Sequence, residues 1–289
     1  MDITIGILGA FGAMLCWGVG DFLIQRSVRK IGNLEALAAI GITGTLGLLP
    51  FIFKDIPLLL QPSNLFLLLV LSVITFITSV LNFEAFREGK LSVVDVILEV
   101  ELPVTIVFAW MFLRETVSPA QLFILFVIFI GVILVAIESL SLSHLKKSLE
   151  KGAVLAFFAA VMMGLSNFFT AASARTISPL LAIWLPWMIV SVLCIGVLVK
   201  RGTFLVGVHN AIASKRLIIA MGILDTLAWL LYAFTLQSNQ VAIATGISES
   251  YPAIAVMLGV WFNKESVKKH QYLGVIVALG ASIVLAIIA

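Results

Sequence analysis

The chain has little charge, few cysteines and few histidines. Only 11% of its 289 residues are Asp, Glu, Lys or Arg, less than half of the roughly 25% found in soluble domains. Cys16 and Cys194 both lie inside apolar runs, so they indicate neither a disulfide framework nor a redox compartment. The three histidines fall in connections, and no metal-ligand spacing such as His-Glu-x-x-His occurs. The sequence therefore predicts no metal site and no cofactor.

Long apolar runs take up most of the chain, which is 62% hydrophobic. A helix needs about 20 apolar residues to cross the hydrocarbon layer, and ten such runs occur. They predict an all-α membrane protein with transmembrane helices over residues 4–25, 34–53, 65–86, 92–113, 119–138, 152–174, 179–199, 217–236, 241–262 and 271–288. Connections are short, the longest being 139–151 and 200–216, and little is left for an extramembrane domain.

The Lys and Arg residues are distributed unequally between the connections. The five odd-numbered connections hold 3, 2, 3, 4 and 3 of them, and the four even-numbered ones hold 1, 1, 1 and 0, which is 15 against 3. By the positive-inside rule the odd connections are cytoplasmic and both termini lie outside. Because these basic residues set orientation, the formal net charge of +3 does not indicate a nucleic-acid partner.

The two halves of the chain repeat one another. Residues 17–22, followed by Arg29, correspond to residues 163–168, followed by Arg175, at an offset of 146. Further pairs continue the repeat at offsets of 148 to 150: Ala85-Phe86 with Ala233-Phe234, Pro103 with Pro252, Glu115 with Glu265 and Gln121 with Gln271. Residues 1–145 and 146–289 are therefore expected to form two repeats of five helices.

Five spans per repeat is an odd number, so the second repeat must enter the membrane from the opposite side. Transporters built from such inverted repeats often bind substrate near the bilayer midplane at the junction of the repeats. Rocking one bundle against the other then gives alternating access. The sequence predicts this architecture, with a central cavity between the halves.

At these residues the sequence resembles the drug/metabolite transporter superfamily, and within it the ten-span EamA-like proteins. The resemblance covers essentially the whole chain. It implies two five-helix repeats around a central cavity and the export or exchange of small metabolites. The residues that carry it are Trp17-Gly18 with Phe22, the echo of these at Gly164 and Phe168, Pro103, the segment Ser250-Tyr251-Pro252-Ala253, and Glu115 and Glu265 before a final Gly-containing span.

Two features depart from the family pattern. The glutamate often follows a Leu-Gly pair, whereas here it follows Leu113-Arg114 and Asn263-Lys264. Similar proteins often keep their termini in the cytoplasm, opposite to the expectation from the charge count. The absolute orientation therefore stays open.

Six acidic residues lie at least three residues from either end of an expected span, with no Lys or Arg at mid-span: Asp21, Asp95, Glu99, Glu101, Asp225 and Glu249. A charge at the bilayer centre costs at least ~2.5–3.5 kcal/mol, so these carboxylates are expected to face a protein-lined or watery interior. Asp95 and Glu99 share a helical face, but Glu101 lies about 200° round from Glu99 in a regular helix. Either Pro103 unwinds that turn or Glu101 packs against a different helix.

Pro103 and Pro252 predict symmetry-related breaks in the fourth and ninth spans. A proline cannot donate to the carbonyl four residues earlier, so the carbonyls of Glu99 and Ser248 are expected to lack a partner. Since a broken helix at membrane depth is tolerated where it lines a cavity, the expected substrate-binding residues here are Glu99, Glu101, Ser248, Glu249 and Tyr251. The alternative is a pair of packing kinks satisfied by neighbouring helices.

Two other spans carry candidate residues for the same cavity. Asp21 follows Trp17 by one turn and has Asn167 as its repeat mate, so the repeat keeps polarity but not charge. Asp225 precedes Trp229 by four and Tyr232 by seven, which places one carboxylate and two rings on one helix face. The alternatives are an interhelical polar contact for Asp21 and packing or an interfacial belt for the rings.

Glu115 and Glu265 are expected to organise the turns that follow them rather than to touch substrate. Burial disfavours the ionised form of a carboxyl group, which predicts proton exchange at one or more of Glu99, Glu249 and Asp21. The carboxylates also predict a substrate with an amine or other positive group, which the faces of Trp17, Trp229 and Tyr251 would attract. A zwitterionic amino acid would also fit if Asn167, Ser248 or helix ends met its carboxylate.

The sequence therefore predicts a secondary active transporter for a small polar or amphipathic metabolite: an amino acid, an amine or a drug-like cation. It is expected to act by alternating access, as an exporter or exchanger with proton coupling, in the cell membrane. The alternative is a passive channel or facilitator. An intramembrane enzyme or a non-transporting scaffold fits less well. The expected partners are the small-molecule substrate, the lipid bilayer and protons, with the chain as a monomer or homodimer.

Overall fold

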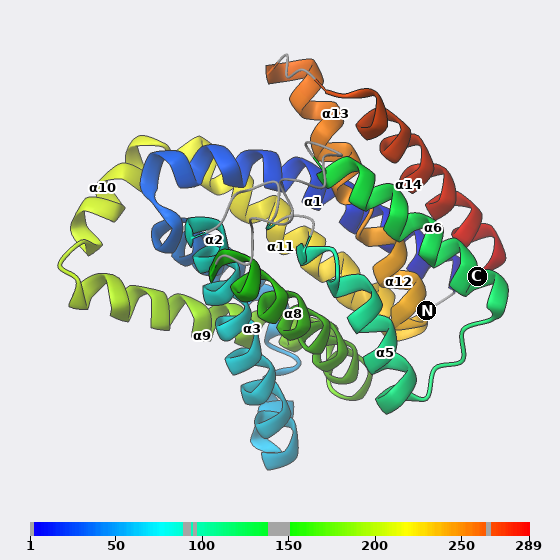
Figure 1. Ribbon diagram of the computed structural model, residues 1–289. Helices are drawn as coiled ribbons and strands as arrows, with labels where there is room; N and C mark the ends of the chain where they lie inside the picture. Colours follow the sequence, from blue (N-terminus) through cyan, green and yellow to red (C-terminus); the bar gives the residue numbers. More distant parts are fainter. Residues whose placement is uncertain (1–2, 89–93, 95–96, 138–150, 264–266) are drawn as a thin grey trace.

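The computed structural model describes residues 3–88, 94, 97–137, 151–263 and 267–289, without the side chains of a few of them, Asp21 and Arg29 included. These residues form helices and short connections with no β-strand (Figure 1). In the first half the helices are α1 (Ile3–Ile31), α2 (Asn33–Ile52), the short 3-10 helix η1 (Ile56–Leu60), α3 (Pro62–Glu88), α5 (Glu101–Leu113) and α6 (Pro119–Ala136). In the second half they are α8 (Lys151–Thr176), α9 (Pro179–Lys200), α10 (Phe204–Ala213), α11 (Lys215–Ser238), α12 (Val241–Ser248), α13 (Tyr251–Asn263) and α14 (Lys269–Ile288).

The ten expected spans correspond to this helix order. Nine stretches of the described residues are long and apolar enough to cross a membrane, one of them formed by α12 and α13 together. The remaining span, over 92–113, lies partly outside the described residues, and its second part is the apolar helix α5. The predicted all-α membrane fold is confirmed.

Helix starts follow the capping signals in the sequence. Ser118 precedes α6, and its hydroxyl accepts from the backbone N–H of Gln121, while the Gln121 side chain accepts from the backbone N–H of Ser118. This reciprocal pair is a capping box, which satisfies two helix-terminal donors. Ser178 caps α9 in a related way, by accepting from two backbone N–H groups. In both cases Pro fills the first helical position, where no N–H is needed.

The helices pack in pairs that follow a pseudo-two-fold relation between the halves. The most extensive contacts are α1 with α11, α3 with α8, α6 with α14 and α2 with α9. The sequence repeat relates α1 to α8 and α3 to α11. The α1–α11 pair is therefore the repeat equivalent of the α8–α3 pair. The other two pairs each join a helix to its own repeat mate. The internal repeat is therefore present in the packing as well as in the sequence.

Two repeat-related glycines show the same relation at atomic detail. A methyl group added at Gly18 would lie 2.5 Å from Cβ of Ile254 in α13, and one added at Gly164 would lie 2.6 Å from Cγ1 of Val104 in α5. The glycines differ by 146 positions and their partners by 150, as in the sequence repeat. Both sites need glycine because only hydrogen leaves room for the crossing helix.

Gln121 and Gln271, the last pair of the repeat, also make equivalent contacts. The Gln121 side chain donates to the carbonyl of Ile288 at the end of α14, and that of Gln271 donates to the carbonyl of Val135 near the end of α6. Each glutamine thus ties the start of one helix to the end of its repeat mate. This arrangement fits the antiparallel α6–α14 pair, whose helices lie side by side in Figure 1.

The even-numbered connections meet at one end of the bundle. Ser178, in the sixth connection, donates its hydroxyl to the carboxylate of Asp55 in the second. Arg175 joins the sixth connection to the fourth and the eighth by bonds to Glu115 and Asn239. Thr235, near the eighth connection, donates to the carbonyl of Gly6 near the start of α1. The first span therefore begins at the end of the bundle that holds the even-numbered connections.

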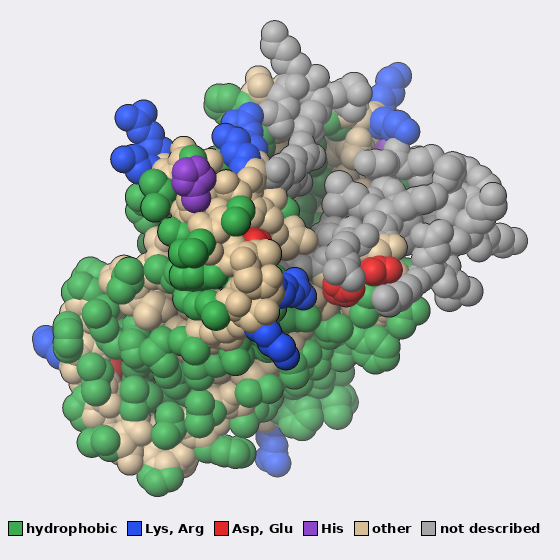
Figure 2. Space-filling model, turned by 90° about the vertical axis from the view of Figure 1, so that its left-hand side faces the viewer, with side chains coloured by type: hydrophobic (Ala, Val, Ile, Leu, Met, Phe, Trp, Pro, Cys, Tyr) green, Lys and Arg blue, Asp and Glu red, His purple; other side chains and the backbone are tan. Residues whose placement is uncertain are grey.

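The connection over 200–216 contains a helix, α10, that the sequence analysis did not expect. Gly207 lies buried against the side chain of Glu35 from the start of α2. The opposite face is apolar but exposed, and it carries Leu205, Val206 and Ile212. Figure 2, which looks from the side where Figure 1 places α10, shows hydrophobic side chains over a broad area of the molecule. Such an exposed apolar surface is expected where lipid replaces water as the solvent.

Candidate functional site

Both symmetry-related spans are broken at the expected places. A turn at Glu99 and Val100 precedes α5, and a turn at Glu249 and Ser250 separates α12 from α13. Glu99 and Glu249 differ by 150 positions, the offset of this part of the repeat. Each break therefore carries a half-buried glutamate at the equivalent point.

One expectation about these breaks is wrong. The carbonyl of Glu99 does not lack a donor, because the backbone N–H of Leu102 reaches it at 3.3 Å. The turn has tightened from the i−4 pattern to the i−3 pattern, which supplies the donor that Pro103 cannot. The break thus changes the path of the chain without leaving that acceptor bare.

Glu101, the first residue of α5, faces the other half of the molecule. Its carboxylate accepts a hydrogen bond of 2.8 Å from the side-chain amide of Asn167 in α8, and the same amide nitrogen donates to the hydroxyl of Thr105 at 3.2 Å. The sequence left two geometries open for Glu101, and the structure shows both of them. The turn before α5 is unwound, and Glu101 contacts a different helix. The amide nitrogen of Asn167 is thereby engaged within the protein.

An aromatic cluster lies at the middle of α1. The ring of Trp17 meets those of Trp229, Tyr232 and Tyr251, with centroids 5.1, 5.5 and 6.2 Å away. Trp229 and Tyr232 come from α11 and Tyr251 from the start of α13. The rings thus join α1 of the first repeat to two helices of the second.

Tyr232 connects the aromatic cluster to α12. Its buried hydroxyl is hydrogen-bonded to that of Thr245 in α12 at 2.6 Å. Thr245 lies in α12, four residues before Glu249 at the break between α12 and α13. The aromatic cluster is therefore bonded to the helix that leads into the break at Glu249.

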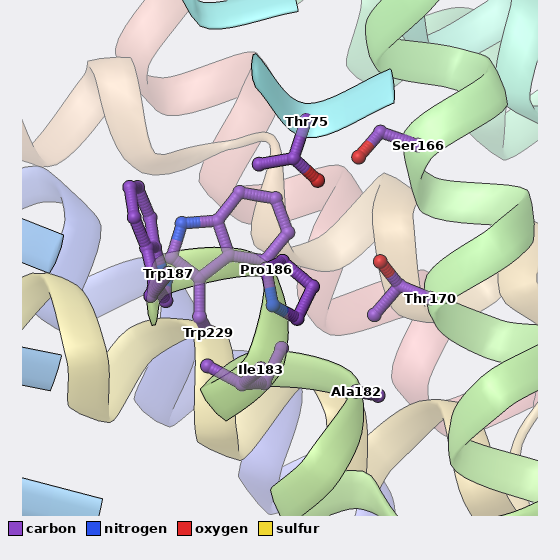
Figure 3. Close-up of a pocket in the computed structure, with 8 residues that line it drawn as sticks. All are labelled: Thr75, Ser166, Thr170, Ala182, Ile183, Pro186, Trp187 and Trp229. Carbon is purple, nitrogen blue, oxygen red and sulfur yellow. The ribbon is translucent and has the colours of Figure 1, made fainter. Parts of the chain in front are cut away.

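A pocket borders the same region. It is a small pocket, with a cavity volume of about 20 Å³, between α3, α8, α9 and α11. Figure 3 shows the ring of Trp229 at its centre, with hydroxyl groups from α3 and α8 on one side and α9 on the other. The lining residues are Thr75, Ser166, Thr170, Ala182, Ile183, Pro186, Trp187 and Trp229.

Asp225 and Ser248 are the remaining candidate residues whose side chains the structure describes. Asp225 is buried on α11, one turn before Trp229. Ser248 is buried at the end of α12, and its hydroxyl donates to the carbonyl of Thr245 at 3.2 Å. Asp95 lies outside the described residues, as does Glu265, and the side chain of Asp21 is not described.

Glu115 forms the centre of a polar clamp at the end of the bundle where the even connections meet. One carboxylate oxygen pairs with the guanidinium of Arg175 at 2.7 Å, and the other accepts from the backbone N–H of Val241, the first residue of α12, at 2.8 Å. Arg175 also donates to the carbonyls of Leu236 and Asn239 at 2.7 Å each. Glu115 was expected to organise the turn that follows it, whereas its carboxylate is bonded to Arg175 and Val241 of the other half.

Sequence reasoning missed the pocket residues on α8 and α9, together with Thr75 and Thr105. Pro186, inside the seventh span, was the available signal, since a proline there cannot donate to the carbonyl one turn earlier. The spacing of Ser166, Thr170 and Ser173 along one face of α8 was a second signal. No group of three or more potential metal ligands occurs among the described residues.

Comparison with known proteins places this architecture in a family. The profile of the EamA-like transporter family matches residues 4–137 and again 150–287. The chain belongs to the EamA-like transporter family. It is accordingly a multi-pass membrane transporter of the drug/metabolite transporter superfamily, with two EamA repeats.

A solved structure supports the fold. A crystal structure, described only as that of a protein, matches with a TM-score of 0.76 and 13% sequence identity, over 98% of this chain and 97% of the other. At this identity the similarity concerns the fold alone. No curated protein sequence compared with the chain matches it.

Proposed function

We propose that this EamA-like transporter is a secondary carrier that exchanges a small amine-bearing metabolite, such as an amine, an amino acid or a drug-like cation, by alternating access. The observation that carries the proposal is Glu101. This carboxylate lies at the junction of the two halves and is bonded across it to Asn167. A group placed between two repeats can be exposed to either side in turn when one repeat rocks against the other.

The substrate class follows from the chemistry of this region. Glu101 bonds to a neutral amide, and among the described residues no Lys or Arg pairs with it. Charges inside a membrane protein generally pair with a second charge or a polar group. A substrate ammonium would supply that charge, and the rings of Trp17 and Trp229 offer it their π faces.

Glu99 and Glu249 are the proposed sites of proton exchange. They occupy equivalent points in the two helix breaks, where helix geometry is already interrupted. A carboxyl group in such a site can take up a proton when the cationic substrate leaves, which keeps the buried charge balanced. Asp21 is the third candidate from the sequence, as the repeat mate of Asn167.

The polar clamp around Glu115 and Arg175 would hold one end of the pathway closed. It joins α5 of the first half to α8, α11 and α12 of the second. Rocking of the halves to open that end requires these bonds to separate. We place the opposite end, with the basic odd connections, in the cytoplasm of a cell whose plasma membrane holds the carrier, as the charge count predicts.

Uptake into proteoliposomes tests the coupling and the role of Glu101 together. Purified protein is first screened for thermal stabilisation by amines, amino acids, sugars and nucleotides, and the best ligand is then used as the labelled probe. We expect amine-bearing ligands to stabilise the wild type and a pH gradient to drive their uptake. Glu101→Gln should lose the stabilisation and the uptake, whereas Glu35→Gln, a change near the start of α2, should retain both.

Two results would contradict parts of the proposal. Stabilisation by sugars or nucleotides but by no amine would refute the substrate class. Uptake that ignores the pH gradient, and is equally unchanged in Glu99→Gln and Glu249→Gln, would remove the proton exchange.

A further inference from the structure

The pocket beside Trp229 contains two buried hydroxyl groups without hydrogen bonds. Ser166 and Thr170 are each only 2% exposed, and neither makes a hydrogen bond within the described residues. Other helical hydroxyls in this protein donate to the carbonyl four residues earlier, as those of Ser72, Thr78 and Ser191 do at 2.7 to 2.8 Å. The hydroxyls of Ser27, Thr45, Ser173 and Thr226 are also buried without a partner, but these residues do not line the pocket. Ser166 and Thr170 do line it, so a group that enters the pocket can pair with their hydroxyls.

Pro186 adds an acceptor to the same pocket. It lies inside α9, where it has no N–H to donate to the carbonyl of Ala182, one turn earlier. Both residues line the pocket. The carbonyl of Ala182 therefore lacks its regular helical donor at a point where a ligand could supply one.

The donors and acceptors of the pocket define the group that fits. The hydroxyl of Thr75 donates to the carbonyl of Leu71 at 2.9 Å, so toward the pocket it can only accept. The carbonyl of Ala182 is also only an acceptor, while Ser166 and Thr170 can donate or accept. None of the residues that line the pocket is ionisable. A neutral group that carries donor hydrogens, such as a hydroxyl or a primary amide, matches this set.

The pocket adjoins the region proposed for the amine. The ring of Trp229 lines it and also meets Trp17 in the aromatic cluster. Ser166 is the neighbour of Asn167, whose amide holds Glu101. In Figure 3 the hydroxyls of Thr75 and Ser166 lie near one another beside the Trp229 ring, with Thr170 farther along the same helix as Ser166.

We infer that this pocket binds a neutral hydroxyl or primary amide of the transported amine, so that the substrate carries an amine and a second, uncharged hydrogen-bonding group. The inference rests on the proposed function for the amine end of the substrate. The pocket, with a cavity volume of about 20 Å³, suits one small group rather than a whole metabolite. The pocket thereby selects among amines that Glu101 alone would not distinguish.

Matched ligand pairs test this selection. The probes are ethanolamine with propylamine, L-serine with L-2-aminobutyrate, and L-asparagine with L-leucine, in which a polar end group is replaced by an apolar one of similar size. Apparent affinities come from thermal stabilisation of the purified protein at increasing ligand concentration. We expect the polar member of at least one pair to bind about fivefold to tenfold more tightly, the range that one net hydrogen bond supports.

The variants Thr170→Val and Ser166→Ala should bring the affinity ratio of the polar to the apolar ligand close to one. They should weaken the binding of the polar ligand and leave that of the apolar one unchanged. Thr176→Val, on the same helix outside the pocket, should keep the ratio. Pro186→Ala restores a donor for the Ala182 carbonyl and should also lower the ratio. Pro50→Ala is its control, since Pro50 is an exposed proline inside α2.

The possible outcomes separate this inference from the proposed function. An unchanged ratio in both Thr170→Val and Ser166→Ala overturns the pocket assignment, as does the absence of any polar preference or of any stabilisation by all six probes. Glu101→Gln should weaken both members of a pair equally. If Glu101→Gln weakens neither member while Thr170→Val abolishes the preference, the pocket stands and the proposed amine site fails.

Discussion

The polar clamp and the central site around Glu101 contain similar polar groups, but they differ in how many of these groups have hydrogen-bond partners within the protein. In the clamp, Glu115 is 7% exposed and Arg175 27%, and both carboxylate oxygens and the guanidinium are bonded within the protein. In the centre, Glu101 has one bond to a neutral amide, and the hydroxyls of Ser166 and Thr170 make none within the described residues. The clamp is complete without a ligand, whereas the centre is not.

We propose that this difference separates a structural role from a binding role. Polar groups buried inside a protein destabilise it unless their partners are present. The clamp avoids that cost with partners from its own chain. In our proposal the substrate supplies the missing partners in the centre, so mutations in the two regions should have opposite profiles. Clamp variants should lose stability, and central variants should lose function while remaining folded.

The largest expected effect is that of Glu115→Ala. It leaves the partly buried guanidinium of Arg175 without its counter-charge and removes the acceptor for the Val241 N–H. Loss of one partner of a buried ion pair costs about 3–5 kcal/mol, and we expect Tm in detergent to fall by roughly 6–12 °C. Differential scanning fluorimetry measures this shift. An unchanged Tm would show that the clamp does not hold the two halves together.

The second effect is that of Glu101→Gln on transport. The substitution keeps the size of the side chain and an acceptor for Asn167, but removes the charge proposed to bind an ammonium. We expect uptake of the amine probe to fall by about a hundredfold, since hydrogen bonds to charged groups contribute about 1.5–3 kcal/mol, with Tm changing by less than that of Glu115→Ala. Equal loss of Tm in both variants would remove the distinction between clamp and centre.

The paired glycines predict equal effects in the two halves. Gly18→Ala and Gly164→Ala each place a methyl group within 2.6 Å of a side chain and 3.0 Å of the backbone of the crossing helix. Overpacking of this kind costs about 1–3 kcal/mol, so both variants should lower Tm by similar amounts. Gly196→Ala is the control, because its methyl group would meet nothing within 4 Å. A large loss in one half alone would contradict the pseudo-two-fold relation.

The smallest effect concerns Tyr232→Phe. It removes the hydroxyl bonded to Thr245 and keeps the ring against Trp17. A single hydrogen bond contributes about 0.5–1.5 kcal/mol, so thermal stability should change by a few degrees at most. Amine binding should stay within about twofold of wild type, because the aromatic surface is preserved. A loss of binding comparable to that of Glu101→Gln would assign the hydroxyl to the substrate site.

Much of the fold could be predicted from the sequence because apolar length and the repeat are properties of the chain itself. The spans, the breaks near Pro103 and Pro252 and the equivalence of Gly18 and Gly164 all follow from such local patterns. Helix α10 was missed because it lies within a connection too short and too basic to resemble a span.

The site was less predictable, because it depends on which groups find partners. Glu115 and Arg175 are 60 residues apart, and no local pattern shows that they pair. Ser166 and Thr170 look like ordinary helical hydroxyls until the structure shows that they make none of the expected bonds. Trp17, Trp229 and Tyr251 were noted because a tryptophan or tyrosine at mid-span is conspicuous in sequence, and their rings do lie together. Their binding of a cation stays a prediction.

Counterflow in proteoliposomes tests the central claim, a binding site exposed in turn to each side of the membrane through Glu101. Vesicles preloaded with an unlabelled amine that stabilises the protein are diluted into a trace of the same amine in labelled form. The account predicts a transient accumulation of label above its equilibrium level with the wild type, and none with Glu101→Gln. Label that merely equilibrates with the wild type, or an overshoot that persists undiminished in Glu101→Gln, would contradict it.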